Sequence, residues 1–137
     1  MSTSISIEAV VESELSKTWQ CYTDPEHIVH WNFAHESWHC PAARNDLKIG
    51  GTYFARMEAR DGSFGFDFET VYTQVRPMKD FTYAFGGREA TVVFTEEEGR
   101  TRVAIDFIAE TENSIDDQRN GWQAILNNFK SYCESAL

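Results

Sequence analysis

Apolar and polar residues alternate along most of the chain, as they do in strands that bury one face of a sheet. The alternation starts near the N-terminus and predicts a first strand over residues 5–11. Two short helices are expected after this strand. Ser13 is the predicted cap of the first helix, and the second is expected to open with Asp24 as its cap and Pro25 as its first residue.

The second half of the chain continues the alternation as a meander of short strands. Apolar positions alternate through residues 53–57, 64–75, 81–85, 92–94 and 103–107. Tight turns at Asp61-Gly62, Gly86-Gly87 and Glu98-Gly99 separate several of these strands. Short connections imply that strands following one another in the sequence are antiparallel neighbours.

One of these strands changes its apolar phase along its length. Phe66 and Phe68 alternate with polar residues, whereas the next apolar residues, Val71 and Val75, are one position out of step. An extra residue in a strand produces such a shift, so the pattern predicts a β-bulge between Glu69 and Tyr72.

Residues 114–135 have the spacing of an amphipathic helix with one broad apolar face. At 1.5 Å per residue, this helix would be roughly 30 Å long, enough to cross a sheet. The predicted fold is therefore α+β, with one helix-grip domain over residues 1–137. In this fold a curved antiparallel sheet of six or seven strands wraps around the long C-terminal helix, and two short helices follow the first strand.

The segment over residues 31–45 fits neither periodicity and is predicted to be an irregular loop. It contains Trp31, Phe33 and Trp38, which must pack against something because loops normally run through solvent. These aromatic residues could line the mouth of a pocket between sheet and helix, or they could close the open end of the core. Both can hold, because a lid over a cavity is also a plug.

Two residues of the long helix indicate space instead of solid packing, and both are candidate ligand-binding residues. Gly121 interrupts a good helix at a cost of about 1 kcal/mol relative to Ala. Gln118 projects near the middle of the apolar face, where a polar group needs a partner. Simple exposure near the helix start would also account for Gln118.

Charge and composition exclude several classes of function. The chain carries 12 basic and 22 acidic side chains, a net charge of -10, without a basic stripe, so we expect no nucleic-acid or membrane partner. No apolar run reaches the roughly 18 residues of a membrane helix, and the N-terminus lacks the features of a secretory signal. Together with 3 widely spaced cysteines, these features predict a cytoplasmic protein with reduced thiols.

The histidines do not form a convincing metal site. His35 and His39 have the i, i+4 spacing of helical zinc ligands, but Pro41 argues against a helix there. We expect no metal and no cofactor. His39 is the histidine most suited to point into a pocket, where it could act as a base near neutral pH.

Carboxylates on two neighbouring strands are expected to be structural. Asp67 and Glu69 share a strand face opposite the phenylalanines, and Arg56 and Glu58 face the same way on the adjacent strand. Cross-strand ion pairs on a solvated outer face would account for these four residues without catalysis. The chain also lacks the common nucleophile and phosphate-binding motifs.

Several motifs resemble a known superfamily. The N-terminal part resembles the START-like (SRPBCC, or helix-grip) superfamily in the runs A-V-V-E-S-E-L-S-K-T-W and T-D-P-E-H-I-V-H-W. A narrower likeness, to the bacterial single-domain branch related to the activator of the heat-shock-protein-90 ATPase, lies in W-N-F-A-H-E-S-W-H-C-P, G-G-T-Y, D-G-S-F-G-F-D-F-E and G-W-Q-A-I-L-N-N-F-K. The superfamily includes lipid carriers, plant hormone receptors, polyketide cyclases and an antibiotic-sequestering protein.

This resemblance implies a cavity between the sheet and the long helix. In this chain it would be lined by Trp31, Phe33, Trp38, Tyr53, Met57, Phe66, Phe68, Tyr83, Trp122, Ile125 and Phe129. The branch has no single catalytic motif to carry over. The eukaryotic co-chaperone has a separate N-terminal domain for which this chain has no room, so we expect no chaperone partner.

These features favour binding or sequestration of a small hydrophobic or aromatic molecule without turnover. One alternative is a cyclase- or hydratase-like enzyme, with His39 and Tyr83 as candidate acid–base groups. Another is a chaperone-associated protein-interaction module, which predicts a large exposed apolar patch. A homodimer stays open, and the residues do not identify the ligand.

Overall fold

The computed structural model describes residues 3–135, and within them seven strands form one antiparallel sheet in the order β1-β7-β6-β5-β4-β3-β2. The strands are β1 (Ser4–Val11), β2 (Trp38–Asn45), β3 (Thr52–Ala59), β4 (Gly65–Arg76), β5 (Asp80–Phe85), β6 (Arg88–Glu97) and β7 (Arg100–Ile108). The first two strands of the chain therefore occupy opposite edges of the sheet. The segment that connects these edges contains the helices α1 (Leu15–Thr23) and α2 (Pro25–Ile28).

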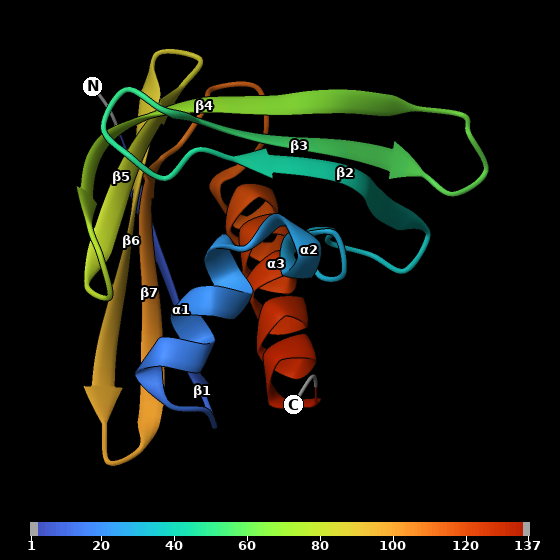
Figure 1. Cartoon of the computed structure of the whole chain (residues 1–137). Helices are drawn as coiled ribbons and strands as arrows, with labels where there is room; N and C mark the ends of the chain where they lie inside the picture. Colours follow the sequence, from blue (N-terminus) through green and yellow to red (C-terminus); the bar gives the residue numbers. More distant parts are fainter. Residues whose placement is uncertain (1–2, 136–137) are drawn as a thin grey trace.

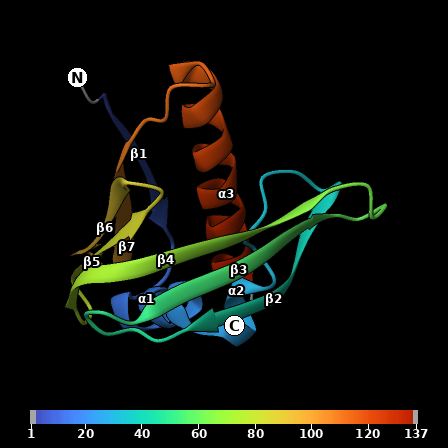
Figure 2. The same cartoon turned by 90° about the horizontal axis from the view of Figure 1, so that it is seen from above.

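The sheet bends around the long helix α3 (Ile115–Ser135). Strands β2, β3 and β4 run at a steep angle to β1, β6 and β7, and α3 lies in the angle between them (Figures 1 and 2). This arrangement confirms the predicted α+β helix-grip fold. None of the helices within residues 3–135 is both long and apolar enough to cross a membrane.

A β-bulge in β4 sets the curvature of the sheet near its centre. The pairing of β4 with β5 shifts register between Tyr72 and Gln74, just beyond the predicted position. Val71 is 45% exposed on the convex face, so its predicted inward orientation is wrong. The inward position belongs to Thr70, a buried polar residue whose hydroxyl donates to the carbonyl of Tyr53. A polar residue on the buried face thus concealed the true phase of the strand.

The prediction of a loop over residues 31–45 is correct only for its first part. Trp38–Asn45 forms β2, which brings the number of strands in the sheet to seven and pairs with β3 at one edge. The pairing is irregular between His39 and Ala42, where Pro41 has no N–H to donate. This irregularity removes the alternation by which a strand is recognised in a sequence.

The structure confirms one of the two predicted helix caps and adds one for α3. Asp24 accepts the N–H of Glu26 at 2.9 Å and caps α2, and Ser114 accepts an N–H of the first turn of α3 at 3.0 Å. The predicted cap of α1 is wrong. Ser13 lies before Glu14, the residue at the cap position, and its buried hydroxyl has no hydrogen-bond partner among the described residues.

Helix α1 fills one end of the concave side of the sheet with aromatic side chains. Trp19 packs edge-on against Phe94 with ring centroids 5.0 Å apart, and Tyr22 packs against Phe129 of α3 at 4.8 Å. This packing fills the core between α1, the sheet and the second half of α3. The space beside the first half of α3 is filled less completely.

Candidate ligand-binding cavity

A cavity of about 330 Å³ lies between the concave face of the sheet and α3. It is lined by Tyr22, Trp31, Asn32, Tyr53, Met57, Phe66, Phe68, Tyr72, Phe81, Tyr83, Phe85, Arg88, Ile105, Trp122, Ile125 and Leu126. Aromatic rings make up most of this lining. The volume is near the lower limit of small-molecule sites and would hold about eleven waters at roughly 30 Å³ each.

The alternation of β3 and β4 supplies one wall of the cavity. Met57 lies directly opposite Phe66, and Phe68 is on the same face two residues further along β4. Residues two positions apart in a strand project from the same face, so these side chains all point toward α3. Tyr72 continues the wall beyond them and pairs with Tyr83 of β5.

The cavity has a closed floor and an open side. Tyr53 and Phe81 in its floor are buried, whereas Trp122 and Ile125 of α3 are half-buried and Phe66 is 44% exposed. The exposed members lie on α3 and on the facing strands. A ligand would therefore enter between the first half of α3 and the β3–β4 hairpin.

Trp31 forms the floor and is held in place by polar and aromatic contacts. Its indole N–H donates to the carbonyl of Cys21 at 2.9 Å, and its own carbonyl accepts from the amide of Asn128 at 2.8 Å. Its ring contacts Tyr22 and Phe129 at centroid distances of 4.9 and 5.0 Å. Trp31 thus links the short helices to α3, and it can be a plug of the core and a wall of the cavity at once.

Two tyrosine hydroxyls of the cavity lining are fixed by asparagine side chains. The amide of Asn32 donates to the hydroxyl of Tyr53 at 2.7 Å, and the hydroxyl of Tyr72 donates to the amide oxygen of Asn45 at 2.7 Å. Asn45 in turn donates to the carbonyl of Thr23 at 2.7 Å. These bonds orient the rings and connect the strands to the segment of α1 and α2.

Two further tyrosine hydroxyls have no such partner. The hydroxyls of Tyr22 and Tyr83 make no hydrogen bond to any residue within 3–135, although both side chains line the cavity. Burial is the main cause that raises the pKa of both phenols above their usual range. Both groups therefore stay protonated at neutral pH and can each donate one hydrogen bond into the cavity.

The structure places eight of the residues predicted to bind ligand around the cavity, namely Trp31, Tyr53, Met57, Phe66, Phe68, Tyr83, Trp122 and Ile125. Three predicted aromatic residues lie outside it. Phe129 is fully buried beneath the floor, and Phe33 lines a separate depression beside α3. Trp38 packs against Phe64 and Phe66 at the end of the β3–β4 hairpin.

The two polar or small candidates on α3 also lie outside the cavity. The side chain of Gln118 accepts the N–H of Glu110 at 2.9 Å and donates to the carbonyl of Asn113 at 2.9 Å. Gln118 therefore joins the start of α3 to the preceding loop. A side-chain carbon added at Gly121 would meet no atom within 4 Å, so no neighbour requires a glycine there.

Sequence reasoning missed half of the lining. The missed residues are Tyr22, Asn32, Tyr72, Phe81, Phe85, Arg88, Ile105 and Leu126. The alternation of β5 contains a signal for two of them, because Phe81 and Phe85 share the face of Tyr83. The others depend on where the sheet curves, which the pattern of a single strand does not report.

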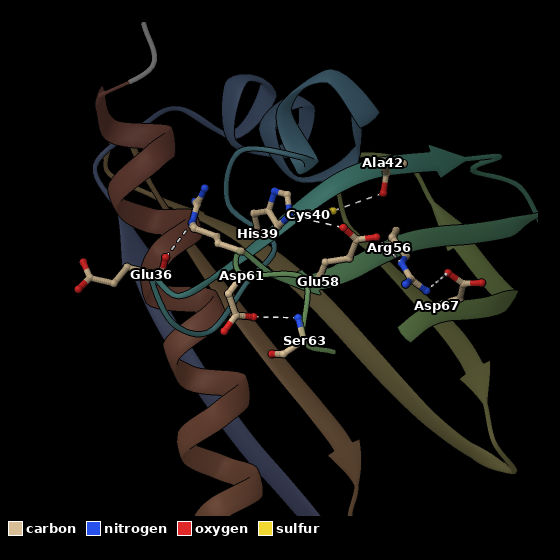
Figure 3. A network of polar contacts seen from close by, with 10 residues as sticks. Glu36, His39, Cys40, Ala42, Arg56, Glu58, Asp61, Ser63 and Asp67 are labelled. Carbon is tan, nitrogen blue, oxygen red and sulfur yellow. Dashed lines mark hydrogen bonds and ion pairs between the residues drawn. The ribbon is translucent and has the colours of Figure 1, made fainter. Parts of the chain in front are cut away.

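His39 lies on the outer face of the sheet and not in the cavity. Its Nε2 is 3.6 Å from one carboxylate oxygen of Glu58, and the other oxygen of Glu58 accepts from Arg56 at 2.8 Å (Figure 3). Arg56 also bonds to Asp67 of the adjacent strand at 3.1 Å. The predicted outer-face ion pairs are thus present for Arg56, Glu58 and Asp67. The structure does not bring His39 together with Tyr83.

The other histidines also lie outside the cavity lining. His27 is hydrogen-bonded to the hydroxyl of Tyr132 at 2.7 Å, His30 stacks on the same ring, and His35 contacts Ser37. Across residues 3–135, His, Cys, Asp and Glu side chains form no cluster of three or more that could hold a metal ion.

Comparison with known proteins gives a consistent result over nearly the whole chain. The family model described as Activator of Hsp90 ATPase homolog 1-like protein matches residues 12–134. An AHSA1-like protein from Aeromonas hydrophila is 42% identical, with a TM-score of 0.93 over 98% of this chain and 94% of that one. A protein from Cytophaga hutchinsonii is 44% identical, with a TM-score of 0.82 over 96% of this chain and 92% of that one.

More distant similarity shows the fold alone. A Nitrosomonas europaea protein with 16% identity has a TM-score of 0.83 and covers 97% of this chain and 95% of that one. No curated protein matches the chain.

Proposed function

The chain belongs to the activator of Hsp90 ATPase homolog 1-like family, and from its cavity we propose that it binds a small, largely apolar or aromatic molecule without transforming it. The observation that carries this proposal is the aromatic-lined space of about 330 Å³ between the sheet and α3. Small-molecule sites are typically apolar concavities with a few well-placed polar groups. This space has both properties.

The lining favours a flat aromatic body over a flexible chain. Rings that meet edge to face or offset-stacked gain roughly 0.5–1.5 kcal/mol beyond the burial of their area. Trp122 and Phe85 flank the open side, and the rings of Tyr83 and Phe68 meet edge to face with centroids 6.2 Å apart. An aromatic ligand would extend this network of ring contacts. The hydroxyls of Tyr22 and Tyr83 would donate to an oxygen of the ligand.

Binding without turnover follows from the chemistry of the lining. Proton-transfer catalysis needs a group whose pKa lies near the working pH. The polar side chains of the lining belong to Tyr, Asn and Arg, and burial raises the pKa of the tyrosines further. The enzyme alternative required His39 beside Tyr83, and His39 lies on the other face of the sheet.

The protein-interaction alternative rests on an aromatic tip formed by Trp38, Phe64 and Phe66. Phe64 is 62% exposed and Phe66 is 44% exposed, so the end of the β3–β4 hairpin presents apolar surface. The variant Phe64→Ser separates the two hypotheses. It should weaken any binding of a partner protein to the tip while leaving small-molecule binding unchanged.

Calorimetric titration with naphthylethanol, and with its acid naphthylacetate, tests the proposed function. The wild-type protein should bind with a stoichiometry of one. Ile125→Trp, which places a large ring in the cavity, should weaken binding at least about tenfold, equivalent to about 1.4 kcal/mol. Asn120→Trp is the matched control, because it adds the same ring to an exposed position of the same helix.

The two variants also make the test decisive. If Asn120→Trp changes binding less than about twofold and Ile125→Trp abolishes it, the ligand occupies the cavity. If neither naphthalene compound binds to the wild-type protein, or if Ile125→Trp binds as the wild type does, the proposal is contradicted. Thermal unfolding of each variant shows whether it is folded.

A further inference from the structure

One charged side chain lies in the lining of the cavity, and it is Arg88 at the start of β6. Among residues 3–135, no aspartate, glutamate, lysine or histidine contributes to the lining. The chain as a whole has a net charge of -10, yet among the described residues no acidic side chain accompanies this arginine in the lining. Arg88 follows the tight turn after β5, next to the half-buried Phe85 and near the open side.

The contacts of Arg88 leave most of its donors free. One guanidinium nitrogen donates to the carbonyl of Ile108 at 2.8 Å, and the guanidinium lies over the ring of Phe85 at 4.6 Å from its centroid. A guanidinium carries five N–H donors, so this single bond leaves four. Within residues 3–135, no carboxylate comes within ion-pair distance of Arg88.

One acidic group that interacts electrostatically with Arg88 is Glu110, in the loop before α3. Arg88 contributes to the lowered pKa of Glu110, but the main causes are hydrogen bonds from the backbone of Glu112 and the side chain of Asn113. These bonds already occupy the carboxylate of Glu110. Glu110 therefore does not neutralise Arg88 by direct pairing.

The ring of Phe85 and the carbonyl of Ile108 hold the guanidinium in a fixed orientation. Such a fork is preorganised for a planar carboxylate, which can accept two parallel N–H bonds. The surrounding rings exclude water on one side and strengthen a charge-assisted bond. Trp122 and Tyr83 line the same cavity as Arg88.

We propose that the ligand is a carboxylate-bearing amphiphile whose aromatic or aliphatic body fills the cavity and whose carboxylate binds to Arg88 at the open side. This inference rests on the proposed function and adds the charge of the ligand to it. The site is sized for a molecule of the order of ten to fifteen non-hydrogen atoms, given the space of about eleven waters. Aromatic acids and medium-chain fatty acids are in this class.

A purely structural role for Arg88 makes a different prediction. In that case the bond to Ile108 and the stacking on Phe85 would be the only reasons for an arginine there. Substitution would then loosen the pairing of β6 with β7 and weaken the binding of every ligand equally. A role in binding the carboxylate weakens only the binding of acids.

The test compares naphthylacetate with naphthylethanol, which share the aromatic body and differ in charge, against wild type, Arg88→Gln and Arg100→Gln. Arg100→Gln removes the same charge at the first residue of β7, at the end of this strand opposite to Ile108, and controls for the change in net charge. The wild type and Arg100→Gln should bind naphthylacetate about tenfold more tightly than naphthylethanol. Arg88→Gln should lose this preference while its affinity for naphthylethanol changes less than about twofold.

The outcomes separate this inference from the function on which it rests. Equal affinity of the wild type for both compounds, or equal weakening of both by Arg88→Gln, overturns the inference and leaves the proposed function intact. Failure of both compounds to bind to the wild type overturns both. A preference for the acid that Arg88→Gln removes and that rising salt reduces supports the inference.

Discussion

The four tyrosines around the cavity should respond differently to the loss of their hydroxyls. Tyr53 and Tyr72 are hydrogen-bonded to asparagines at 2.7 Å, whereas Tyr22 and Tyr83 have no partner for their hydroxyls within residues 3–135. Substitution by phenylalanine removes a single oxygen and keeps the ring. The series therefore isolates the hydrogen bond from the packing.

The magnitudes follow from what each substitution leaves unpaired. Tyr53→Phe leaves the amide of Asn32, which is 5% exposed, without its acceptor, and should cost about 1–3 kcal/mol of unfolding free energy. Tyr72→Phe leaves the oxygen of Asn45, which is half-buried and accessible to water, and should cost about 1 kcal/mol. Tyr22→Phe removes a hydroxyl that makes no bond, and should change stability by less than about 0.5 kcal/mol.

Urea unfolding followed by tryptophan fluorescence measures these differences. With a dependence of roughly 1–3 kcal/mol per molar urea, Tyr53→Phe should lower the midpoint by about half a molar or more. Tyr83→Phe should leave the midpoint within error of the wild type. If Tyr83→Phe or Tyr22→Phe destabilised the protein as much as Tyr53→Phe does, their hydroxyls would be bonded in the fold. The reasoning that they face an open cavity would then be refuted.

Three other substitutions and one thiol reagent test the packing away from the cavity. Hydrogen bonds from Arg76 hold the pKa of Asp80 in the folded protein below its ordinary value of 3.8. The ionised carboxylate therefore stabilises the fold above pH 3.8, and this stabilisation is lost as the pH falls through the lowered folded pKa. Asp80→Asn should therefore cost about 1 kcal/mol by urea unfolding near pH 7 and progressively less as the pH falls through the lowered folded pKa of Asp80, and a cost that does not change with pH would contradict the assignment. Burial raises the pKa of the Cys21 thiol to about 12 and that of Cys40 to about 11, so both should react with Ellman's reagent only after unfolding; rapid reaction of the native protein would contradict this. Gly121→Ala should raise the unfolding free energy by about 0.5–1 kcal/mol, because the added carbon meets no atom. Gly51→Ala should lower it, because the added carbon would lie 2.1 Å from a carbonyl oxygen, and a gain at both positions would contradict the packing.

The fold was predictable because its signals are local. Alternation marks each strand of the meander, and one apolar face marks α3. The edge strand β2 was missed because its irregular pairing around Pro41 breaks the alternation. The buried face of β4 was assigned incorrectly at Val71 because Thr70, a polar residue, occupies the inward position there, whereas Val75 packs against the core as predicted.

The cavity was predictable only in part, for a different reason. Residues such as Met57 and Phe68 project inward whatever the exact curvature of the sheet, so their place in the lining follows from alternation. The position of Arg88 depends on how the β5–β6 turn meets α3, which involves contacts distant in sequence. The aromatic residues Phe33 and Trp38 depend on the path of a loop and an edge strand. An apolar loop residue must pack somewhere, but its sequence does not say against which surface.

Nitrogen–proton correlation spectra of the tryptophan indole groups test the central claim most directly. The chain has 4 tryptophans, of which Trp31 and Trp122 line the cavity, whereas Trp19 packs in the core behind it and Trp38 lies at the aromatic tip. Titration with naphthylacetate should displace the indole signals of Trp31 and Trp122 until saturation, and by more than those of Trp19 and Trp38. Signals that stay in place, or a largest displacement at Trp38, would contradict binding in the cavity between sheet and helix.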